Sequence, residues 1–557
     1  MNEKELKPIH PNKKMERESY ELLDGLWDFT ITKSNLIPDH FEDQINVPYP
    51  VESKLSKIER LCEIDDHLWY RKEIKINKHK GKILLHFGAI DQNAKIYIDS
   101  KLIYTHQGGF LPFAIEISDL DKKDHITLII DAWDITDSSY LTVGNQAIEP
   151  VGKKHTRISG IWQSVWMEYV NEHYISNIDI ETDYDHSCIM IKTDVQTSLS
   201  YKLNVHFIHN EYPDSNDRMI HLYNFKPWSY DKPYLYELQI DLIEEDKVID
   251  SIYTYFAMRK IEVKKDGEYK HIYFNNQKIF LNGIIDGGYN SEGLYTPVSQ
   301  ETMLKDILMI KELGFNLIRK YEKIESDVFY YYCDLYGMLV LQDFVSGGEI
   351  EKRYQHSIGQ IIHKMHINIS DNVRFLFSRK NIYGKTMFID EINQTVRILK
   401  HHPCIIAFSL FNDGKGQFDT ALITKLIKSL DKDRLILSAE NLYDQNCGDF
   451  YAIHVLDYKK KIKVKKDRLN LISEYGYLSY DLNSTNQKYK NLSLLNDAYI
   501  KLHYELILKN YPKLAGCIYY QFCDIEQEKN GIINEDRTDL KINRQHILEI
   551  NQYLKNK

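Results

Sequence analysis

Short apolar runs and alternating apolar–polar runs recur along the first third of the chain, separated by turn-forming residues. Many short strands at this spacing are typical of a β-sandwich. The expected strands are Leu26–Thr32, Trp69–Ile76, Lys82–Phe87, Ala94–Ile98, His125–Ala132 and Ile161–Val170. We therefore expect residues 1–173 to form a jelly-roll-like sandwich.

The same pattern continues through residues 174–262. The expected strands here are Ile175–Thr182, Cys188–Val195, Lys202–His209, Tyr234–Ile243 and Ser251–Ala257. A segment of roughly 90 residues with this many strands has the size of an immunoglobulin-like sandwich. We expect its repeated aromatic residues to belong to the core.

At about residue 263 the pattern changes to strands that alternate with helices. In the helical segment Ser299–Leu313, apolar residues recur at helical spacing. The eight expected strands are Phe280–Ile285, Asn316–Lys320, Met338–Phe344, Cys404–Leu410, Arg434–Ala439, Phe450–Val455, Leu469–Ser473 and Gly516–Phe522. Eight strands over this length favour a (β/α)8 barrel for residues 263–557, with a doubly wound sheet as the alternative.

Composition narrows the classes of partner. The formal net charge is −10, which argues against a nucleic-acid-binding surface. The basic run Lys459–Lys466 is a local exception, which we interpret as a solvated loop or as a contact for phosphate or an acidic sugar. The 41 tyrosines suit sugar binding, because an aromatic ring packs on sugar C–H groups while its hydroxyl bonds sugar hydroxyls. A general drift of composition toward Lys, Asn, Ile and Tyr is the explanation that we favour for them.

The seven cysteines are widely spaced and form no Cys-x-x-Cys pair. This favours reduced thiols over a disulfide framework or a zinc site, and we expect neither a metal nor a cofactor. The first 20 residues lack the apolar core of a signal peptide, and no apolar stretch approaches the ~18 residues of a membrane span. We therefore expect a cytoplasmic protein with no membrane partner; whether it forms a homo-oligomer is left open.

In a barrel of this kind, catalytic residues stand where strands end at the C-terminal face. The residues at the eight expected strand ends are mainly carboxylates, amides and tyrosines. In strand order they are Asp286 and Tyr289, Arg319 and Tyr321, Gln342 and Asp343, Asn412 and Asp413, Glu440 and Asn441, His454 and Asp457, Glu474 and Tyr475, and Gln521 and Asp524. The substrate-binding candidates among them are Asp286, Tyr289, Arg319, Tyr321, Asn412, His454 and Gln521.

Two carboxylates in this set suit glycoside hydrolysis. One carboxyl protonates the leaving oxygen, the other attacks the anomeric carbon, and for retention they stand ~5–5.5 Å apart. Strands four and seven lie across a barrel mouth from each other, so Asp413 and Glu474 at their ends are expected to face one another. Glu440, at the end of strand five, is an alternative acid. The strand ends show no metal-ligand spacing, no Ser–His–Asp set and no phosphate-binding glycine loop.

Several segments resemble glycoside hydrolase family 2, the β-galactosidase and β-glucuronidase family, along nearly the whole chain. Their order and spacing carry the resemblance, which implies a sugar-binding-type sandwich, an immunoglobulin-like sandwich and a catalytic barrel. The segments are Leu23–Phe29, Leu85–Asp91, His106–Phe113, Ser159–Trp166, Trp228–Tyr236, Phe256–Arg259, Phe280–Gly283, Leu313–Arg319, His402-Pro403 and Phe411-Asn412-Asp413.

The resemblance also implies roles for individual residues. Asp413 takes the place of the acid/base carboxylate, and Asn412 before it would bond the sugar 2-hydroxyl. Glu474, in the sequence Glu474-Tyr475-Gly476, takes the place of the nucleophile. Arg319 would lie beside the nucleophile and keep it ionised, since an adjacent cation favours a carboxylate. The first sandwich would pack beside the barrel mouth and narrow the site. The implied substrate is a small β-linked carbohydrate or glycoside.

The chain also departs from the family pattern, most clearly at Asp413, where the family has Glu. Aspartate is one methylene shorter, and a misplacement of about 1 Å can cost on the order of 100-fold in rate. The other departures are Lys415 for Trp, Tyr321 for His, Leu456 for Tyr and Asn290 for Trp. The leading hypothesis is a retaining β-glycosidase. The alternatives are a weakened or inactive carbohydrate-binding protein on the same scaffold, and a transglycosylase.

Overall fold

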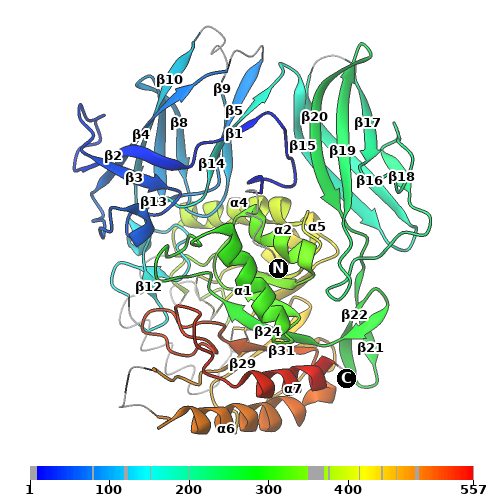
Figure 1. Cartoon of the computed structure of the whole chain (residues 1–557). Helices are drawn as coiled ribbons and strands as arrows, with labels where there is room; N and C mark the ends of the chain where they lie inside the picture. The colour runs from blue at the N-terminus through cyan, green and yellow to red at the C-terminus, as the bar shows by residue number, and fades with distance from the viewer. Residues whose placement is uncertain are drawn as a thin grey trace.

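The computed structural model describes residues 9–77, 81–117, 123–150, 152–197, 200–348, 369–373, 377–412, 414, 416–440, 443–459, 461–482, 484 and 488–555. These residues form two β-sandwiches that stand side by side above a barrel (Figure 1). The first sandwich is blue, the second runs from cyan to green, and the barrel runs from green to red. The predicted fold class is confirmed, and the closed barrel excludes the doubly wound sheet.

The N-terminal sandwich has two antiparallel sheets, of orders β3-β2-β4-β10-β7-β8 and β1-β14-β5-β9. Their inward-facing apolar residues share one buried core, as the alternating sequence pattern predicts. The strands are β1 Tyr20–Leu22, β2 Gly25–Thr32, β3 Asp43–Val47, β4 His67–Lys75, β5 Lys82–Phe87, β7 Asn93–Ile98, β8 Lys101–Gln107, β9 Phe113–Ile117, β10 His125–Trp133 and β14 Val165–Val170. Two short 3-10 helices, η1 Lys54–Ser56 and η2 Thr136–Ser138, lie in its loops.

Two short strand pairs complete this sandwich and correct one prediction. β6 (Ile90–Asp91) pairs with β13 (Gly160–Ile161), and β11 (Gln146–Ala147) pairs with β12 (His155–Thr156). The segment 161–170, expected as one strand, is therefore split between β13 and β14. The physical reason is a change of partner, since β13 bonds to β6 whereas β14 inserts between β1 and β5.

The second sandwich packs two three-stranded antiparallel sheets, β15-β16-β18 and β17-β19-β20, around its own apolar core. β20 begins earlier than expected, because a tight turn after β19 extends the hairpin. The strands are β15 Tyr174–Asp183, β16 Cys188–Gln196, β17 Lys202–Phe207, β18 Met219–His221, β19 Tyr236–Glu244 and β20 Lys247–Phe256.

A small antiparallel sheet, absent from the sequence-based expectation, lies between the second sandwich and the barrel. Its strands are β21 Ile261–Asp266, β22 Tyr269–Phe274 and β23 Gln277–Ile279. The sandwich also bonds to the barrel directly, because the buried hydroxyl of Tyr255 donates to Asp334 at 2.7 Å and lies 2.9 Å from His402 Nδ1. Burial opposes a charge on His402, yet Asp327 and Asp334 outweigh it and raise its pKa to about 9. The two bodies therefore share a buried polar contact.

Eight parallel strands form the barrel, in the order β28-β27-β26-β25-β24-β31-β30-β29. The barrel closes where β28 and β29 meet through a parallel bridge between Glu440 and Ala452. Each strand coincides with an expected one. The strands are β24 Leu281–Asp286, β25 Leu317–Lys320, β26 Leu339–Asp343, β27 Ile405–Phe411, β28 Leu435–Ala439, β29 Phe450–Val455, β30 Leu469–Gly476 and β31 Gly516–Tyr520.

Helices cover the outside of the barrel (Figure 1). The expected helix 299–313 is α1 (Gln300–Glu312), which begins at a capping box between Ser299 and Thr302 and buries its apolar stripe. The others are α2 Asp327–Tyr336, α4 Ile382–Leu399, α5 Thr420–Leu430, α6 Leu492–Leu502, α7 Arg544–Lys555, the π-helix η4 His503–Leu508 and the 3-10 helix η5 Tyr511–Lys513. Among the described residues, no helix has the length and apolar character needed to span a membrane.

Candidate active site

The closed parallel barrel brings the carboxyl ends of its strands to one mouth. Glu474 lies near the carboxyl end of β30, two residues before the strand ends at Gly476. His454 is its register partner on the neighbouring strand β29. Arg319 belongs to β25, and Asn412 follows β27 directly. Asp413, the candidate acid/base residue, lies outside the described residues.

Glu474 is a fully buried carboxylate that accepts hydrogen bonds from two sides. Lys153 Nζ donates to its Oε1 at 2.6 Å, and the hydroxyl of Tyr477 donates to the same oxygen. His454 Nε2 lies 3.8 Å from that oxygen. One of the two predicted carboxylates therefore stands at the mouth among groups that favour its ionised form.

His454 links Glu474 to a second buried carboxylate, Glu440. Its Nδ1 lies 2.8 Å from Glu440 Oε2 and its Nε2 lies 2.7 Å from the Tyr477 hydroxyl. A carboxylate only accepts, so Nδ1 carries the hydrogen of the first contact. His454 thus bridges Glu440 and the Tyr477 hydroxyl, and that hydroxyl in turn donates to Glu474.

Arg319 is fully buried and holds several groups at the mouth together. Its guanidinium donates to Asp343 Oδ1 at 2.9 Å, to the Ser473 carbonyl at 3.0 Å and to Asn412 Oδ1 at 3.0 Å. Burial opposes its charge, yet the carboxylates of Asp343 and Glu440 outweigh burial and hold the pKa of Arg319 above its ordinary value. Arg319 thus fixes the amide of Asn412 by its oxygen, and the amide nitrogen donates to Glu322 Oε1 at 3.4 Å.

Two other predicted residues make their contacts elsewhere. Asp286 accepts from Lys320 Nζ at 2.9 Å, and the Tyr289 hydroxyl donates to Glu526 at 2.6 Å. Both line a cavity of about 520 Å³ between α1 and the ends of β24 and β25, whose lining does not include Glu474. The structure therefore gathers Asp286 and Tyr289 around a neighbouring space and not around the nucleophile candidate.

The last two predicted residues lie close to the central group. Tyr321 has the Arg319 guanidinium 5.5 Å from its ring centre and meets Tyr520 edge to face. Gln521 directly follows β31 and is buried; within the described part of the chain its Nε2 has no hydrogen-bond partner. A buried amide without a partner is rare in folded proteins, so Gln521 remains a good candidate for a ligand contact.

Sequence reasoning missed two of the groups that contact Glu474. Tyr477 lies three residues beyond Glu474, where the strand has ended, so a search restricted to strand ends stopped just short of it. Lys153 belongs to the first sandwich and is 321 residues away in sequence. The local sequence signal there is the loop Gly152-Lys153-Lys154, with its two adjacent lysines. No local pattern connects that loop to the barrel.

The described residues contain two groups of side chains with metal-ligand spacing. Glu440, His454 and Glu474 form one group, with ligand-type atoms within 4.8 Å of one another, but the contacts described above already engage both imidazole nitrogens. We therefore interpret them as a hydrogen-bonded relay. The other group is Glu63, Asp65 and Asp66 in the first sandwich, and all three form ion pairs with Lys33.

Family models match all three parts of the chain. The model described as the glycosyl hydrolases family 2 TIM barrel domain matches residues 261–539. The family 2 sugar binding domain matches residues 15–170, and a further family 2 model matches residues 177–259. Together these matches span both sandwiches and the barrel.

Curated relatives are distant. A β-galactosidase of Thermoanaerobacter pseudethanolicus is 23% identical over 487 residues, which cover 80% of this chain and 58% of the relative. A putative β-glucuronidase of Formosa agariphila is 26% identical over 49% of this chain and 34% of the relative. A β-glucuronidase of Streptococcus agalactiae is 22% identical, over 78% of this chain and 74% of its own length. The chain thus spans little more than half of the first of these relatives and a third of the second.

Solved structures share the fold along the whole chain. A β-glucuronidase of Ruminococcus gnavus superposes with a TM-score of 0.78 at 16% identity, covering 98% of this chain and 99% of that one. A family 2 β-galacturonidase of Eisenbergiella tayi, bound to galacturonate, superposes with a TM-score of 0.74 at 17% identity, covering 97% and 98%. At these identities the likeness establishes the fold alone.

Proposed function

We propose that this chain, which belongs to glycosyl hydrolase family 2, hydrolyses β-linked glycosides at its barrel mouth, with Glu474 as nucleophile and Asp413 as acid/base. The observation that carries the proposal is Glu474 itself. It is a buried carboxylate at the carboxyl end of β30, it accepts from Lys153 and Tyr477, and it lies within the segment that matches the family's barrel.

The chemistry follows from two carboxyl groups in different protonation states. The ionised Glu474 attacks the anomeric carbon, the bond to the leaving oxygen breaks, and Asp413 gives that oxygen its proton. Water then attacks the glycosyl–Glu474 ester while Asp413 takes the proton from the water, which restores both groups. Asn412, held by Arg319 through its oxygen, would donate from its amide nitrogen to a sugar hydroxyl.

The proposed sugars are those named for the relatives and structural neighbours. These names cover β-galactosides, β-glucuronides and β-galacturonides. The substrate class is therefore a terminal β-linked hexose or hexuronic acid.

A panel of 4-nitrophenyl β-glycosides tests the proposal. We expect turnover of at least one galactoside, glucuronide or galacturonide, and a loss on the order of 10⁴- to 10⁶-fold in Glu474→Gln, as for removal of an enzyme's nucleophile. Glu505→Gln, the same change at a half-exposed glutamate in the outer π-helix η4, is the control and should keep wild-type rates. Turnover that survives Glu474→Gln would reject Glu474 as the nucleophile.

A second candidate function, sugar binding without turnover, is favoured by the short side chain at Asp413. General acid catalysis contributes about 10²- to 10⁴-fold, and a misplacement of about 1 Å can remove about 100-fold of it. If the binding hypothesis holds, the wild type binds sugar without releasing nitrophenol, and Asp413→Glu restores release. Wild-type turnover that falls 10²-fold or more in Asp413→Asn would instead establish the enzyme.

A further inference from the structure

A lysine in contact with Glu474 comes from the first sandwich and not from the barrel. Lys153 Nζ forms an ion pair with Glu474 at 2.6 Å and also donates to the Tyr477 hydroxyl at 3.2 Å. The ammonium lies 5.1 Å from the ring centre of Tyr477 and 4.9 Å from that of Tyr520. Arg319, expected to be the neighbouring cation, directs its hydrogen bonds to other groups.

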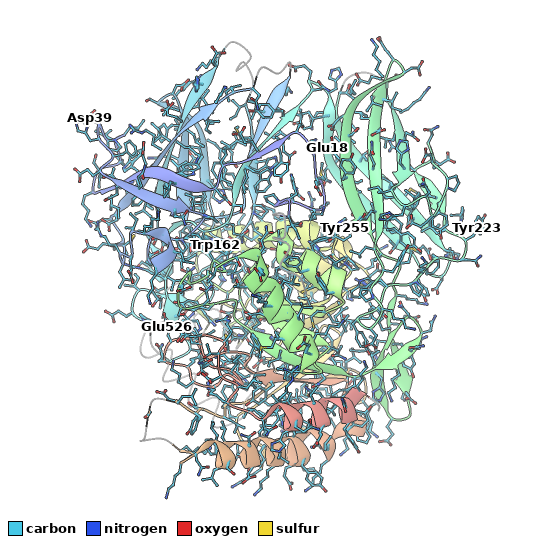
Figure 2. The ribbon with its side chains drawn as sticks, in the orientation of Figure 1. Glu18, Asp39, Trp162, Tyr223, Tyr255 and Glu526 are labelled. Atoms are coloured by element: carbon cyan, nitrogen blue, oxygen red, sulfur yellow. The ribbon has the colours of Figure 1, made fainter. Side chains whose placement is uncertain are left out.

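A set of bonds from the barrel holds the loop that carries Lys153. Gln527 Nε2 donates to the carbonyls of Gly152 and Lys154, one on each side of Lys153. The Thr156 amide donates to both carboxylate oxygens of Glu526, at 3.2 and 3.1 Å. Figure 2 shows Glu526 on the barrel side, next to this strand of the sandwich.

The same barrel loop fixes the strand behind Lys153. Glu526 also accepts from Tyr289, and Glu528 accepts from Tyr520 at 2.7 Å while lying 3.5 Å from His155 Nε2. Residues 526–528 thus contact the segment 152–156 along its length. The pairing of β12 with β11 holds the other edge of that segment. Lys153 is pre-positioned by contacts on both sides, which reduces the entropy lost when its ammonium is held at Glu474.

The charges around Glu474 explain why a cation is needed there. Full burial and neighbouring carboxylates both favour the protonated form of a carboxyl group, whereas a nucleophile must be ionised. Besides Lys153, the ionisable groups near Glu474 in the described part of the chain include Arg319, Glu440, His454, Tyr477, Tyr520 and Glu528. Burial raises the pKa of Glu528 to about 6, and Lys153 opposes that rise while Glu474 adds to it.

We propose that Lys153 of the N-terminal sandwich is a further catalytic residue, whose ammonium holds Glu474 in the ionised form that attacks the anomeric carbon. The inference rests on the proposed function, and it makes the first sandwich a component of the active site. The barrel alone would lack this cation. Neutralising Lys153 should therefore slow glycosyl transfer to Glu474 at low pH and leave it nearly unchanged at high pH.

The test measures that transfer alone, with 2-deoxy-2-fluoro-β-glycosyl fluorides of galactose, glucuronic acid and galacturonic acid. In this step the Glu474 oxygen bonds to C1, the C1–F bond breaks and fluoride leaves, so Asp413 need not supply a proton. Intact mass and peptide mapping follow the ester on Glu474 between pH 4 and 9. In Lys153→Met we expect the pH at which the labelling rate falls on the acidic side of the profile to rise by about one unit. At a given pH on that side, labelling would then be about tenfold slower than in the wild type.

Matched variants separate this role from a structural one. Lys95→Met removes a lysine of the same sandwich with similar exposure, 28% against 33%, which lies over Trp133 and 3.9 Å from Asp131. It should leave the pH profile unchanged. Lys153→Arg keeps the cation and should keep the wild-type profile, and Lys153→Gln replaces the methionine variant if that variant unfolds.

The outcomes distinguish the two proposals. Wild-type labelling at Glu474 with the same acid limb in Lys153→Met and Lys153→Gln overturns the role of Lys153 and leaves the proposed function intact. No labelling of the wild type by any of the three fluorides overturns Glu474 as the nucleophile, and the role of Lys153 with it.

Discussion

Replacing Glu52 by glutamine should stabilise the first sandwich at alkaline pH and not at acidic pH. Glu52 lies in the loop after β3, is only 8% exposed and accepts from the Ser159 amide at 2.8 Å. Ser159 immediately precedes β13, so the contact ties two distant segments of the sandwich together. Glutamine keeps the size of the side chain and an oxygen that can accept the same bond.

The magnitude follows from the protonation of Glu52. Burial raises its pKa from the ordinary value of 4.5 to about 7, with Asp134 adding to the rise and hydrogen bonds from Ser159 opposing it. Between these values the folded state holds the proton and the unfolded state releases it, so the free energy of unfolding falls as pH rises through this range. One pKa unit corresponds to about 1.4 kcal/mol, which makes the loss about 3 kcal/mol above pH 7. Glutamine does not titrate and escapes this loss.

Thermal unfolding of the wild type and Glu52→Gln at pH 5 and pH 8 measures the effect. The extra N–H of the amide can cost about 1–3 kcal/mol at every pH, so the informative quantity is the change in the difference between the two proteins. We expect the difference in Tm to grow by about 6–12 °C in favour of the variant from pH 5 to pH 8. Glu42→Gln, at an exposed position of the same sandwich, is the control. An equal Tm difference at both pH values would refute the reasoning.

Two further changes probe the barrel mouth. Tyr477→Phe removes the hydroxyl that bonds Glu474 and His454. A hydrogen bond to a charged group is worth about 1.5–3 kcal/mol, so turnover of an aryl β-glycoside should fall about 10- to 100-fold; unchanged kinetics would contradict the contact's role. Arg319→Met leaves Asp343 buried without its cation and should lower the free energy of unfolding by about 3–5 kcal/mol in urea titrations. A loss in the free energy of unfolding below about 1 kcal/mol would show that burial of Asp343 does not require the charge of Arg319.

Local sequence patterns determined most of the architecture. The eight barrel strands were predicted because each is a short apolar run between turn-forming residues, and that signal lies within a few residues. The prediction for α1 succeeded for the same reason, since apolar residues at helical spacing within 299–313 form its buried stripe. Glu474 could be selected because a parallel barrel collects its strand ends at one mouth, which is a rule of topology and needs no side-chain detail.

Only the tertiary structure decided which groups surround Glu474. Lys153 contacts Glu474 although 321 residues separate them in the sequence. The hydrogen bonds of residues 526–528 to the segment 152–156 join the barrel to the first sandwich. Likewise Asp286 lies at a strand end as predicted, yet its carboxylate accepts a hydrogen bond from Lys320 on the adjacent strand. Sequence patterns specify the period and the ends of each element because these depend on neighbouring residues. The partner of a charged side chain depends on packing between distant segments. It is therefore determined only by how the sandwich packs against the barrel.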